Sequence, residues 1–180
     1  MYNFHYNYIR PKYGDRAELL MTDTDSLMYQ IFTDDVYQDM QKDIDHFDTS
    51  DYPQDHFLHS NHNKKVVGKM KDELAGLPIK QFVGLRSKMY SVKAGKIEKK
   101  RAKGVKRSVV ANNIRHSDYK DTLSNKQFKY HKMNMIRSFK HQLYTVTLNK
   151  KSLGCFDDKR YILQNGVMTL ALGNCAIPMV

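Results

Sequence analysis

The stretch Leu19-Leu20-Met21-Thr22-Asp23-Thr24-Asp25-Ser26-Leu27-Met28-Tyr29 sets two carboxylates between two apolar runs. Leu19 to Met21 and Leu27 to Phe32 each have the length of a buried strand. Asp and Thr are poor residues inside a strand but good ones in a tight connection. The pattern therefore predicts a β-hairpin with Asp23 and Asp25 at its tip.

The surroundings of the tip decide what these two acids mean. Side chains at positions i and i+2 of an extended backbone point the same way, which would bring Asp23 and Asp25 close together. Two like charges about 4 Å apart repel by ~1 kcal/mol in water and ~4 kcal/mol in a partly buried site. In a cleft the pair would need a proton or a cation, and hard oxygen ligands suit Mg²⁺ or Mn²⁺. At an exposed turn it would be an ordinary solvated acidic turn.

Spacing limits the metal-binding alternatives. An EF-hand loop needs further oxygen ligands and a Gly, but Leu27 and Met28 stand where the ligands would fall. A glycosyltransferase-type Asp-x-Asp, which holds a metal-bound nucleotide, remains open. That alternative predicts no basic surface for a polymer.

Composition favours a polyanionic partner. The 180 residues carry a net charge of +11, from 30 Lys and Arg against 19 Asp and Glu, which indicates nucleic acid or a membrane surface. No apolar run approaches the ~18 residues that span a bilayer, and no signal peptide opens the chain. We therefore expect an intracellular protein and no membrane partner. Cys155 and Cys175 form no Cys-x-x-Cys pattern, so neither a disulfide framework nor a zinc site is implied.

Two helices are expected around the hairpin. Aromatic residues at helical spacing predict one at the N-terminus, ended by Pro11 and Gly14. After the hairpin, Thr33 or Asp34 can cap a second helix. Its apolar face would hold Val36, Met40, Ile44 and Phe47, and its acidic face, expected to be solvated, Asp35, Asp39, Asp43 and Asp45. The spacing of His56, His59 and His62 suggests a metal site, but we interpret them as ordinary polar residues.

The middle of the chain combines strands with positive charge. Val66 to Glu73 and Gln81 to Lys93 are predicted to be two strands. On the second strand Lys88 could neutralise a phosphate, and Tyr90 on the same face offers a ring and a hydroxyl to sugar or base. From Lys93 to Arg107 eight cations face one acid, which predicts a basic loop that follows a nucleic-acid backbone. A solvated loop or targeting signal is the alternative.

In their order along the chain, these segments resemble family B DNA polymerases. The resemblance is to the protein-primed branch of viruses, linear plasmids, organelles and self-synthesising transposons. Thr22-Asp23-Thr24-Asp25-Ser26 resembles the third palm motif, Tyr-Gly-Asp-Thr-Asp-Ser, with Met21-Thr22 in place of Tyr-Gly. Lys88-Met89-Tyr90 resembles the Lys-x-Tyr motif, and Ala102-Lys103-Gly104-Val105 resembles the Lys-Gly-Val segment between palm and thumb. Phe156-Asp157-Asp158-Lys159-Arg160-Tyr161-Ile162 resembles a terminal signature of the branch.

The resemblance implies an α+β fold in two parts. Residues 1–107 would form the later half of a polymerase palm, an antiparallel sheet with helices, and residues 108–180 a thumb-like region. In the latter, a helix is expected over His116 to Leu123, followed by a capping-box spacing at Ser124 to Gln127. Met133 to Leu148 is predicted to be a strand with a turn at Asn149-Lys150. A basic amphipathic helix over Phe128 to His141 is the alternative.

The resemblance also implies roles for individual residues. The family reaction joins a dNTP to a primer 3′-hydroxyl with two metal ions. Asp25 would be a direct ligand of Mg²⁺ or Mn²⁺ and Asp23 a nearby carboxylate, within the motif completed by Thr22, Thr24 and Ser26. Lys88 and Tyr90 would hold the primer end, and Lys103, Lys106 and Arg107 would hold the duplex. The partners would be a DNA primer-template, dNTP and in some settings a terminal protein primer.

Several family features have no counterpart in the sequence. The metal-binding Asp of the first palm motif, the Lys and Tyr of the finger motif and the exonuclease domain are all missing. We therefore expect a fragment that binds DNA, polymerises poorly by itself and needs an upstream polymerase half. The competing hypothesis is a catalytically inert DNA-binding remnant.

Overall fold

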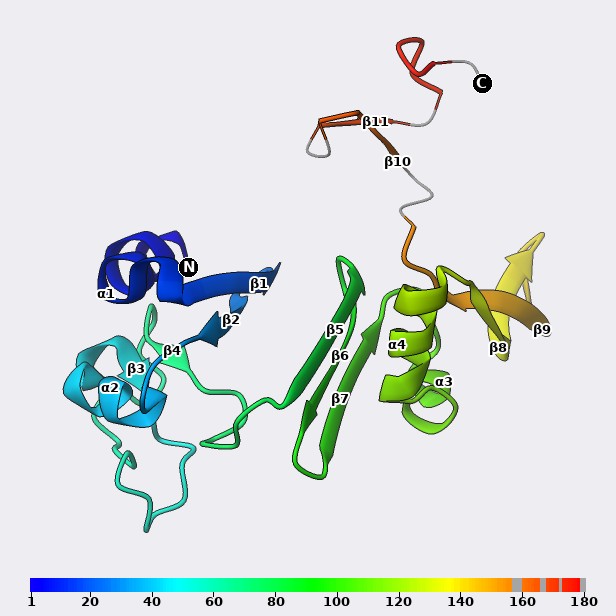
Figure 1. The fold of residues 1–180 in the computed structure, drawn as a ribbon. Coiled ribbons are helices and arrows are strands. Elements are labelled where there is room, and N and C mark those ends of the chain that lie inside the picture. The colour runs from blue at the N-terminus through cyan, green and yellow to red at the C-terminus, as the bar shows by residue number, and fades with distance from the viewer. Residues whose placement is uncertain (157–159, 166–167, 172, 179–180) are drawn as a thin grey trace. The chain divides into compact units, whose positions relative to one another are not determined.

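The computed structural model describes residues 1–156, 160–165, 168–171 and 173–178 (Figure 1). The chain divides into two compact units, Met1–Pro78 and Ile79–Val180. Both combine short helices with small, mainly antiparallel sheets, which confirms the α+β class. No helix within the described ranges is long and apolar enough to cross a bilayer.

The N-terminal helix of the first unit is longer than predicted. A π-helical segment, Phe4–Ile9, continues directly into α1 (Arg10–Tyr13). Pro11 does not end the helix, because it lies in the first turn of α1, where a missing N–H is tolerated. The helix stops at Gly14, whose φ of 53° is readily adopted only by a residue without a Cβ.

The predicted hairpin is present. Strand β1 (Ala17–Asp23) pairs antiparallel with β2 (Ser26–Ile31), with a bulge between Leu19 and Met21. Cross-strand partners share a face of the hairpin. One face, with Ala17, Tyr29 and Ile31, packs against the aromatic core of the unit.

The segment after the hairpin is less regular than predicted. Helix α2 (Val36–Lys42) is capped by the Asp35 carboxylate, which accepts hydrogen bonds from the backbone N–H groups of Tyr37 and Gln38. The predicted cap at Thr33 or Asp34 is therefore wrong. A 3₁₀ turn, Ile44–His46, leads into β3 (Phe47–Asp48), which pairs parallel with β4 (Met70–Lys71). The strand predicted over Val66 to Glu73 shrinks to these two residues of β4.

The acidic side of α2 is not the solvated face that we expected. Tyr13 and Thr33 donate hydroxyl hydrogen bonds to the Asp39 carboxylate at 3.1 and 2.9 Å. Tyr8 donates to Asp43 at 3.0 Å, and Lys12 forms an ion pair with Asp43. These carboxylates therefore join the N-terminal helix to α2. Beneath them lies the core of the unit, formed by Tyr8, Ile9, Tyr13, Met40, Phe47, Tyr52 and Leu58.

The second unit begins with a three-stranded antiparallel sheet in the order β5-β6-β7. Its strands are β5 (Gln81–Arg86), β6 (Met89–Ala94) and β7 (Ile97–Ala102). The single strand predicted over Gln81 to Lys93 is therefore a hairpin that turns at Ser87-Lys88. The segment predicted to be a basic loop contains β7, so its middle is an ordered strand.

Two helices cover one face of this sheet. They are α3 (Arg107–Asn112) and α4 (His116–Asn125). Asp118 caps the start of α4 by accepting the backbone N–H of Arg115 at 2.7 Å. The capping-box spacing at Ser124 to Gln127 therefore marks the end of this helix and not the start of another. The core between sheet and helices contains Val83, Leu85, Met89, Ala102, Val109, Val110, Ile114, Tyr119, Met133 and Leu153.

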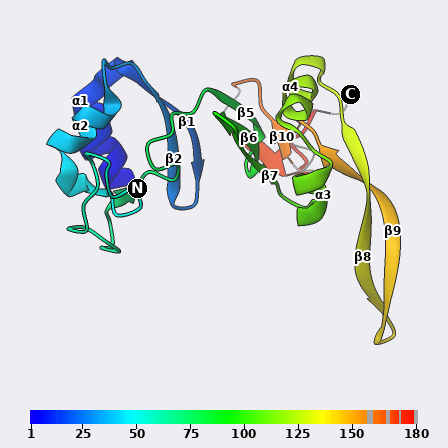
Figure 2. The ribbon, with the colours of Figure 1, turned by 90° about the horizontal axis from the view of Figure 1, so that it is seen from below.

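A long two-stranded ribbon completes the second unit. Strand β8 (Lys129–Phe139) pairs antiparallel with β9 (Gln142–Leu153) through a turn at Lys140-His141 (Figure 2). Strand structure is confirmed here, but the single strand predicted over Met133 to Leu148 is a hairpin that turns at Lys140-His141. The alternative of a helix over Phe128 to His141 is wrong. The predicted turn at Asn149-Lys150 is also wrong, because both residues lie inside β9.

Beyond the ribbon, β10 (Arg160–Ile162) pairs with β11 (Thr169–Ala171). The Asp-Asp-Lys part of the predicted terminal signature, residues 157–159, lies outside the described residues.

Candidate functional site

The tip of the β1–β2 hairpin is an unusually tight turn. Asp23 pairs with Ser26, which leaves Thr24 and Asp25 as the connection. The backbone N–H of Asp25 donates to the carbonyl of Asp23 at 2.7 Å, and Thr24 has a φ of 56°. A positive φ is a rare conformation for a β-branched residue. Backbone strain of this kind persists only where surrounding structure enforces it, and it is concentrated at functional sites.

The turn separates the two acids instead of aligning them. The expectation that Asp23 and Asp25 point the same way required an extended backbone, which Thr24 interrupts. Asp25 is exposed and lines a groove with Thr22 and Leu27, on one face of the hairpin. Asp23 is half-buried, and its pairing with Ser26 assigns it to the opposite face. The structure thus brings the acids to one turn but gives them different surroundings.

The tip has the right atoms for a hard cation but too few of them. Carboxylate oxygens suit Mg²⁺ or Mn²⁺, and the Asp25 carboxylate has no hydrogen-bond or ion-pair partner among the described residues. However, no group of three or more His, Cys, Asp or Glu in the described ranges is arranged to hold a metal ion. Asp25 and Asp23 could hold a metal only with ligands from another segment or from a substrate.

In the second unit the structure brings together cations that are far apart in the sequence. Met89 pairs with Ala102, and the backbone N–H of Lys103 donates to the carbonyl of Lys88 at 3.0 Å. The β5–β6 turn and the turn that follows β7 therefore lie side by side. Lys106 precedes α3 and Arg107 begins it, and all four side chains are exposed.

Sequence reasoning missed a fifth cation at this place. The ammonium of Lys150, in the C-terminal part of β9, donates to the carbonyl of Gly104 at 2.9 Å. The sequence predicts a turn at Lys150, so it gives no signal that this side chain would reach this end of the sheet. We call Lys88, Lys103, Lys106, Arg107 and Lys150 the basic corner.

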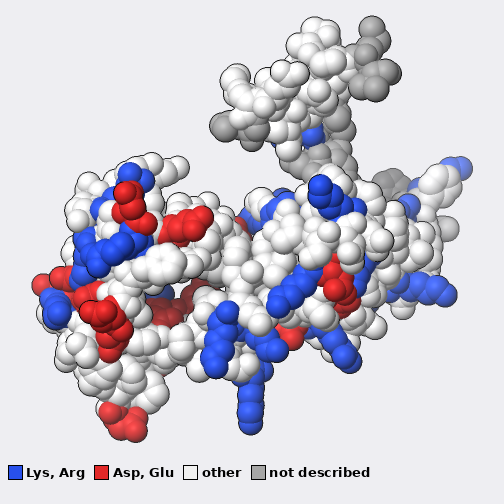
Figure 3. Space-filling view, viewed as in Figure 1, with Lys and Arg blue, Asp and Glu red and all other residues white. Residues whose placement is uncertain are grey.

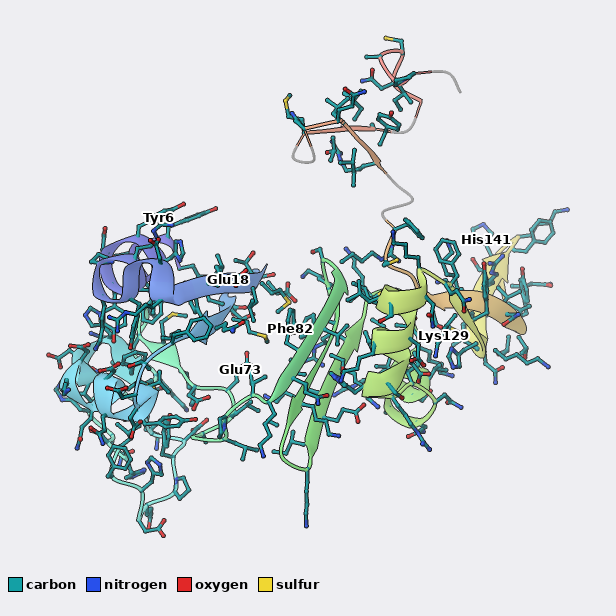
Figure 4. The ribbon with its side chains drawn as sticks, in the orientation of Figure 1. Tyr6, Glu18, Glu73, Phe82, Lys129 and His141 are labelled. Atoms are coloured by element: carbon teal, nitrogen blue, oxygen red, sulfur yellow. The ribbon has the colours of Figure 1, made fainter. Side chains whose placement is uncertain are left out.

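Lys88 and Tyr90 are not arranged as predicted. Lys88 lies in the β5–β6 turn with a φ of 58°, and it does not share a strand face with Tyr90. Tyr90 lies opposite Gly84 and Arg101 in the sheet, and its ring is 6.4 Å from that of Phe82. Neighbouring residues of β6 pack toward α4, so Tyr90 and Phe82 lie on the sheet face away from the helices. Figure 4 labels Phe82 beside β5. A ring and an Arg on that face are suited to contact sugar or base.

Charge separates the two units. Residues 1–78 contain 8 Lys and Arg against 14 Asp and Glu, a net charge of −6. Residues 79–180 contain 22 against 5, a net charge of +17. Figure 3 shows the same contrast, with red and blue mixed over the first unit and blue prevailing over the unit that carries β5 to β9. The net positive charge of the chain therefore comes from the second unit alone.

The described acids of the second unit are occupied by structural contacts. Glu98 accepts the backbone N–H of His116 at 2.6 Å and lies 3.5 Å from Lys100. Asp118 and Asp121 lie 2.6 and 3.4 Å from the ammonium of Lys129. These acids therefore serve the structure of the unit, and its excess of cations gives it a strongly positive net charge.

One predicted cation has a structural role instead. Lys100 donates to the carbonyls of Ala111 and Ile114, beyond the last turn of α3. A cation at a helix C-terminus satisfies carbonyl groups that have no partner within the helix. Lys100 therefore stabilises the junction of β7 and α3 and is not available to a ligand.

Comparisons with known proteins identify no relative: no family model, curated protein or solved structure matches the chain.

Proposed function

We propose that residues 1–180 form the later part of the palm and the thumb-like region of a DNA-directed DNA polymerase. The observation that carries the proposal is the strained hairpin tip, which presents an unpartnered Asp25 within Thr22-Asp23-Thr24-Asp25-Ser26. In the proposed reaction Asp25 and Asp23 would hold Mg²⁺ or Mn²⁺, which would stabilise the charge that develops on the transferred phosphate. Further ligands, including the first palm Asp, would come from another segment.

The basic corner supports the DNA-binding part of this proposal. Five cations from the β5–β6 turn, the β7–α3 connection and β9 surround one end of the sheet. Such a surface neutralises phosphates and releases counterions, so it supplies affinity without sequence preference. We propose that Lys88 and Tyr90 contact the primer end, as the Lys-x-Tyr resemblance implies, and that Lys103, Lys106 and Arg107 contact the duplex backbone.

The β8–β9 ribbon supports binding to a duplex in particular. Residues 129–153 contain six Lys and Arg and no Asp or Glu. Figure 4 marks the two ends of the ribbon with Lys129 at its base and His141 at its tip. The major groove of B-DNA, about 12 Å wide, admits a two-stranded β-ribbon. We propose that the ribbon lies along the duplex that the basic corner holds.

A second candidate function is a DNA-binding module without chemistry. It is favoured by the short ligand set at the hairpin tip, because the described residues offer two carboxylates and no complete metal group. Under this hypothesis only the second unit would matter for DNA, and the acidic tip would be inert.

Binding to a primer-template with and without Mg²⁺ separates the two candidates. The polymerase proposal predicts that Mg²⁺ tightens binding of dNTP and primer-template by the wild-type chain, and that Asp25→Asn abolishes this gain. Asp34→Asn, at an exposed acid outside the tip, is the matched control and should behave as wild type. Identical Mg²⁺ responses of wild type and Asp25→Asn would support the inert module. Weak binding to any DNA at low salt would contradict both.

A further inference from the structure

A groove beside the hairpin tip has no assigned role. It has a volume of about 330 Å³ and lies between the start of the N-terminal helix and the β1–β2 hairpin, within the first unit. Small-molecule sites in proteins typically begin at about 300 Å³. Tyr2 and Tyr6 line one wall, and Thr22, Thr24 and Asp25 line the other.

The tyrosine wall presents two stacked and accessible aromatic rings. The ring centroids of Tyr2 and Tyr6 lie 6.4 Å apart with an angle of 17° between the ring planes. The two residues are 82% and 60% exposed, so their rings are accessible to a ligand. Figure 4 shows Tyr6 on the outside of the N-terminal helix.

The position of this wall is fixed by the hairpin itself. The edge of the His5 ring meets the ring of Tyr6 at 4.7 Å, and His5 Nδ1 forms a 2.9 Å hydrogen bond with the hydroxyl of Tyr29 on β2. The rings of His5 and Tyr29 are also stacked, 5.9 Å apart. The helix and the hairpin are thus connected at this point, so Tyr6 is held next to the Asp25 turn.

The chemistry of the opposite wall selects the ligand. The exposed carboxylate of Asp25 accepts hydrogen bonds from hydroxyl or amino groups and repels bare anions. The hydroxyl of Thr22 can donate or accept, and that of Thr24, which donates to the Asp23 carboxylate at 3.3 Å, can accept. A flat aromatic ligand with hydroxyl or amino donors fits both walls, and this is the chemistry of a nucleoside. A phosphate attached to it would need a cation beside Asp25.

We propose that this groove binds a nucleoside, with the base on Tyr2 and Tyr6 and the sugar or an exocyclic amine facing Asp25. Aromatic side chains stack on any base, so the site would not select among sequences. The proposal rests on the proposed function, since it assigns a nucleotide-binding surface to the turn that would hold the metal. It gives a binding role to Tyr2 and Tyr6, which no resemblance or motif in the sequence indicates.

The test uses 2′-deoxyadenosine, an uncharged nucleoside that the positive field of the second unit does not attract. Binding to the full chain carrying fluorotyrosine would be followed by ¹⁹F NMR. The resonances of Tyr2 and Tyr6 can be identified because they are missing from the spectrum of the Tyr2→Leu/Tyr6→Leu variant. These resonances should shift when the nucleoside binds to the wild-type chain. The variant should bind at least tenfold more weakly, because stacking contributes ~1–3 kcal/mol per base and 1.4 kcal/mol is tenfold.

Three controls make the outcome decisive. Phe57→Leu removes an aromatic ring that is 54% exposed in the first unit but does not line the groove, and it should leave nucleoside binding unchanged. Equal weakening by Phe57→Leu, the absence of nucleoside binding, or equally tight binding of a neutral saccharide would overturn the proposal. Duplex DNA binding of the same variants reports on the basic corner. If DNA binding persists while nucleoside binding is absent, the groove proposal fails and the proposed function stands.

Discussion

The two units use ionisable residues in opposite ways. The first unit, with a net charge of −6, places many of its carboxylates in structural hydrogen bonds: Asp35 caps α2, Asp39 and Asp43 join two helices, and Asp48 closes a turn. The second unit, with a net charge of +17, uses its few described acids for structure and presents its cations to solvent. A carboxylate that lacks a structural partner against this background is a candidate for function, and Asp25 meets that criterion. The basic corner is a second candidate because it gathers five cations at one end of the sheet.

The largest expected effect comes from removing the basic corner. The triple substitution of Lys88, Lys103 and Lys106 by Gln should weaken duplex DNA binding roughly a hundredfold or more at about 0.1 M salt. The slope of log affinity against log salt should fall by about 3, since each phosphate contact contributes ~0.9. Fluorescence anisotropy across a salt series measures both quantities.

A matched triple substitution in the first unit tests whether DNA binding depends on the location of the cations or only on the net charge. Lys42, Lys64 and Lys65 are exposed cations of the acidic unit, and their replacement by Gln should leave affinity and slope near those of wild type. If this control weakened binding as much as the triple substitution in the basic corner, DNA binding would reflect net charge and not a localised surface.

The next effect concerns a carboxylate used for structure. Hydrogen bonds from Ser50 lower the pKa of the buried Asp48 to about 2, helped by the backbone N–H of Lys65 and by Lys71. Asp48→Asn should destabilise the first unit by about 2 kcal/mol, because hydrogen bonds to a charged group contribute ~1.5–3 kcal/mol. Chemical denaturation followed by hydrogen exchange in residues 1–78 measures this.

The same carboxylate gives a pH dependence with a defined sign. Since folding lowers the pKa of Asp48, its stabilisation is present above about pH 4 and is lost as pH falls toward 2. Asp55→Asn, at an exposed position, is the control and should change neither stability nor its acid dependence. A stable Asp48→Asn variant with wild-type acid sensitivity would remove Asp48 from this role.

The second unit has a buried histidine that should respond at milder pH. His116 accepts or donates a 2.9 Å hydrogen bond with Ser91, and its Nε2 atom is buried without a partner. Burial lowers the pKa of His116, with Lys120 and Lys93 adding to the shift and Glu98 opposing it. The unit should therefore lose stability as pH falls below about 6.5, because the unfolded chain binds the proton more readily.

His116→Asn isolates that histidine from the other titrating groups. The Asn amide can replace the bond to Ser91 but carries no proton equilibrium in this range. Urea midpoints of the second unit between pH 7.5 and pH 5 should vary less in His116→Asn than in wild type. The same variation in both proteins would assign the pH response to other groups.

The smallest effect is expected at the hairpin tip. Thr24 has a φ of 56°, so Thr24→Gly should relieve backbone strain and stabilise the first unit by about 0.5 kcal/mol, after the entropy that Gly adds to the unfolded chain. Thr22→Gly, inside β1, should destabilise it. If Thr24→Gly were also destabilising, the strained turn would not be a feature of the hairpin in solution.

The hairpin at the centre of the fold could be predicted because its apolar strands flank a polar turn. Two other hairpin turns could not, since they lack Gly, Pro or Asn. Lys88, Lys140 and His141 adopt positive φ values of 58°, 47° and 64°, which local preference disfavours. The pairing of long strands, and not the turn residues, enforces these conformations.

The difference between local preference and long-range pairing also explains which parts of the candidate sites could be predicted from the sequence. Asp25 and the cations Lys103, Lys106 and Arg107 were identified from residue type and spacing, which are local properties. The contact of Lys103 with Lys88 and the arrival of Lys150 depend on strand register across the sheet and the ribbon. Apart from Thr33, the partners of Asp39 and Asp43 come from a helix that precedes them by more than 20 residues, so the interpretation as a solvated helix face was wrong.

The most direct test of the account is primer extension in a mixture of this chain and a separately expressed segment that carries the first palm and finger motifs. The account predicts extension with both components, little with either alone, and its loss in Asp25→Asn. Extension that is unchanged by Asp25→Asn, or its absence despite tight and salt-sensitive DNA binding, would contradict a catalytic role for the hairpin tip.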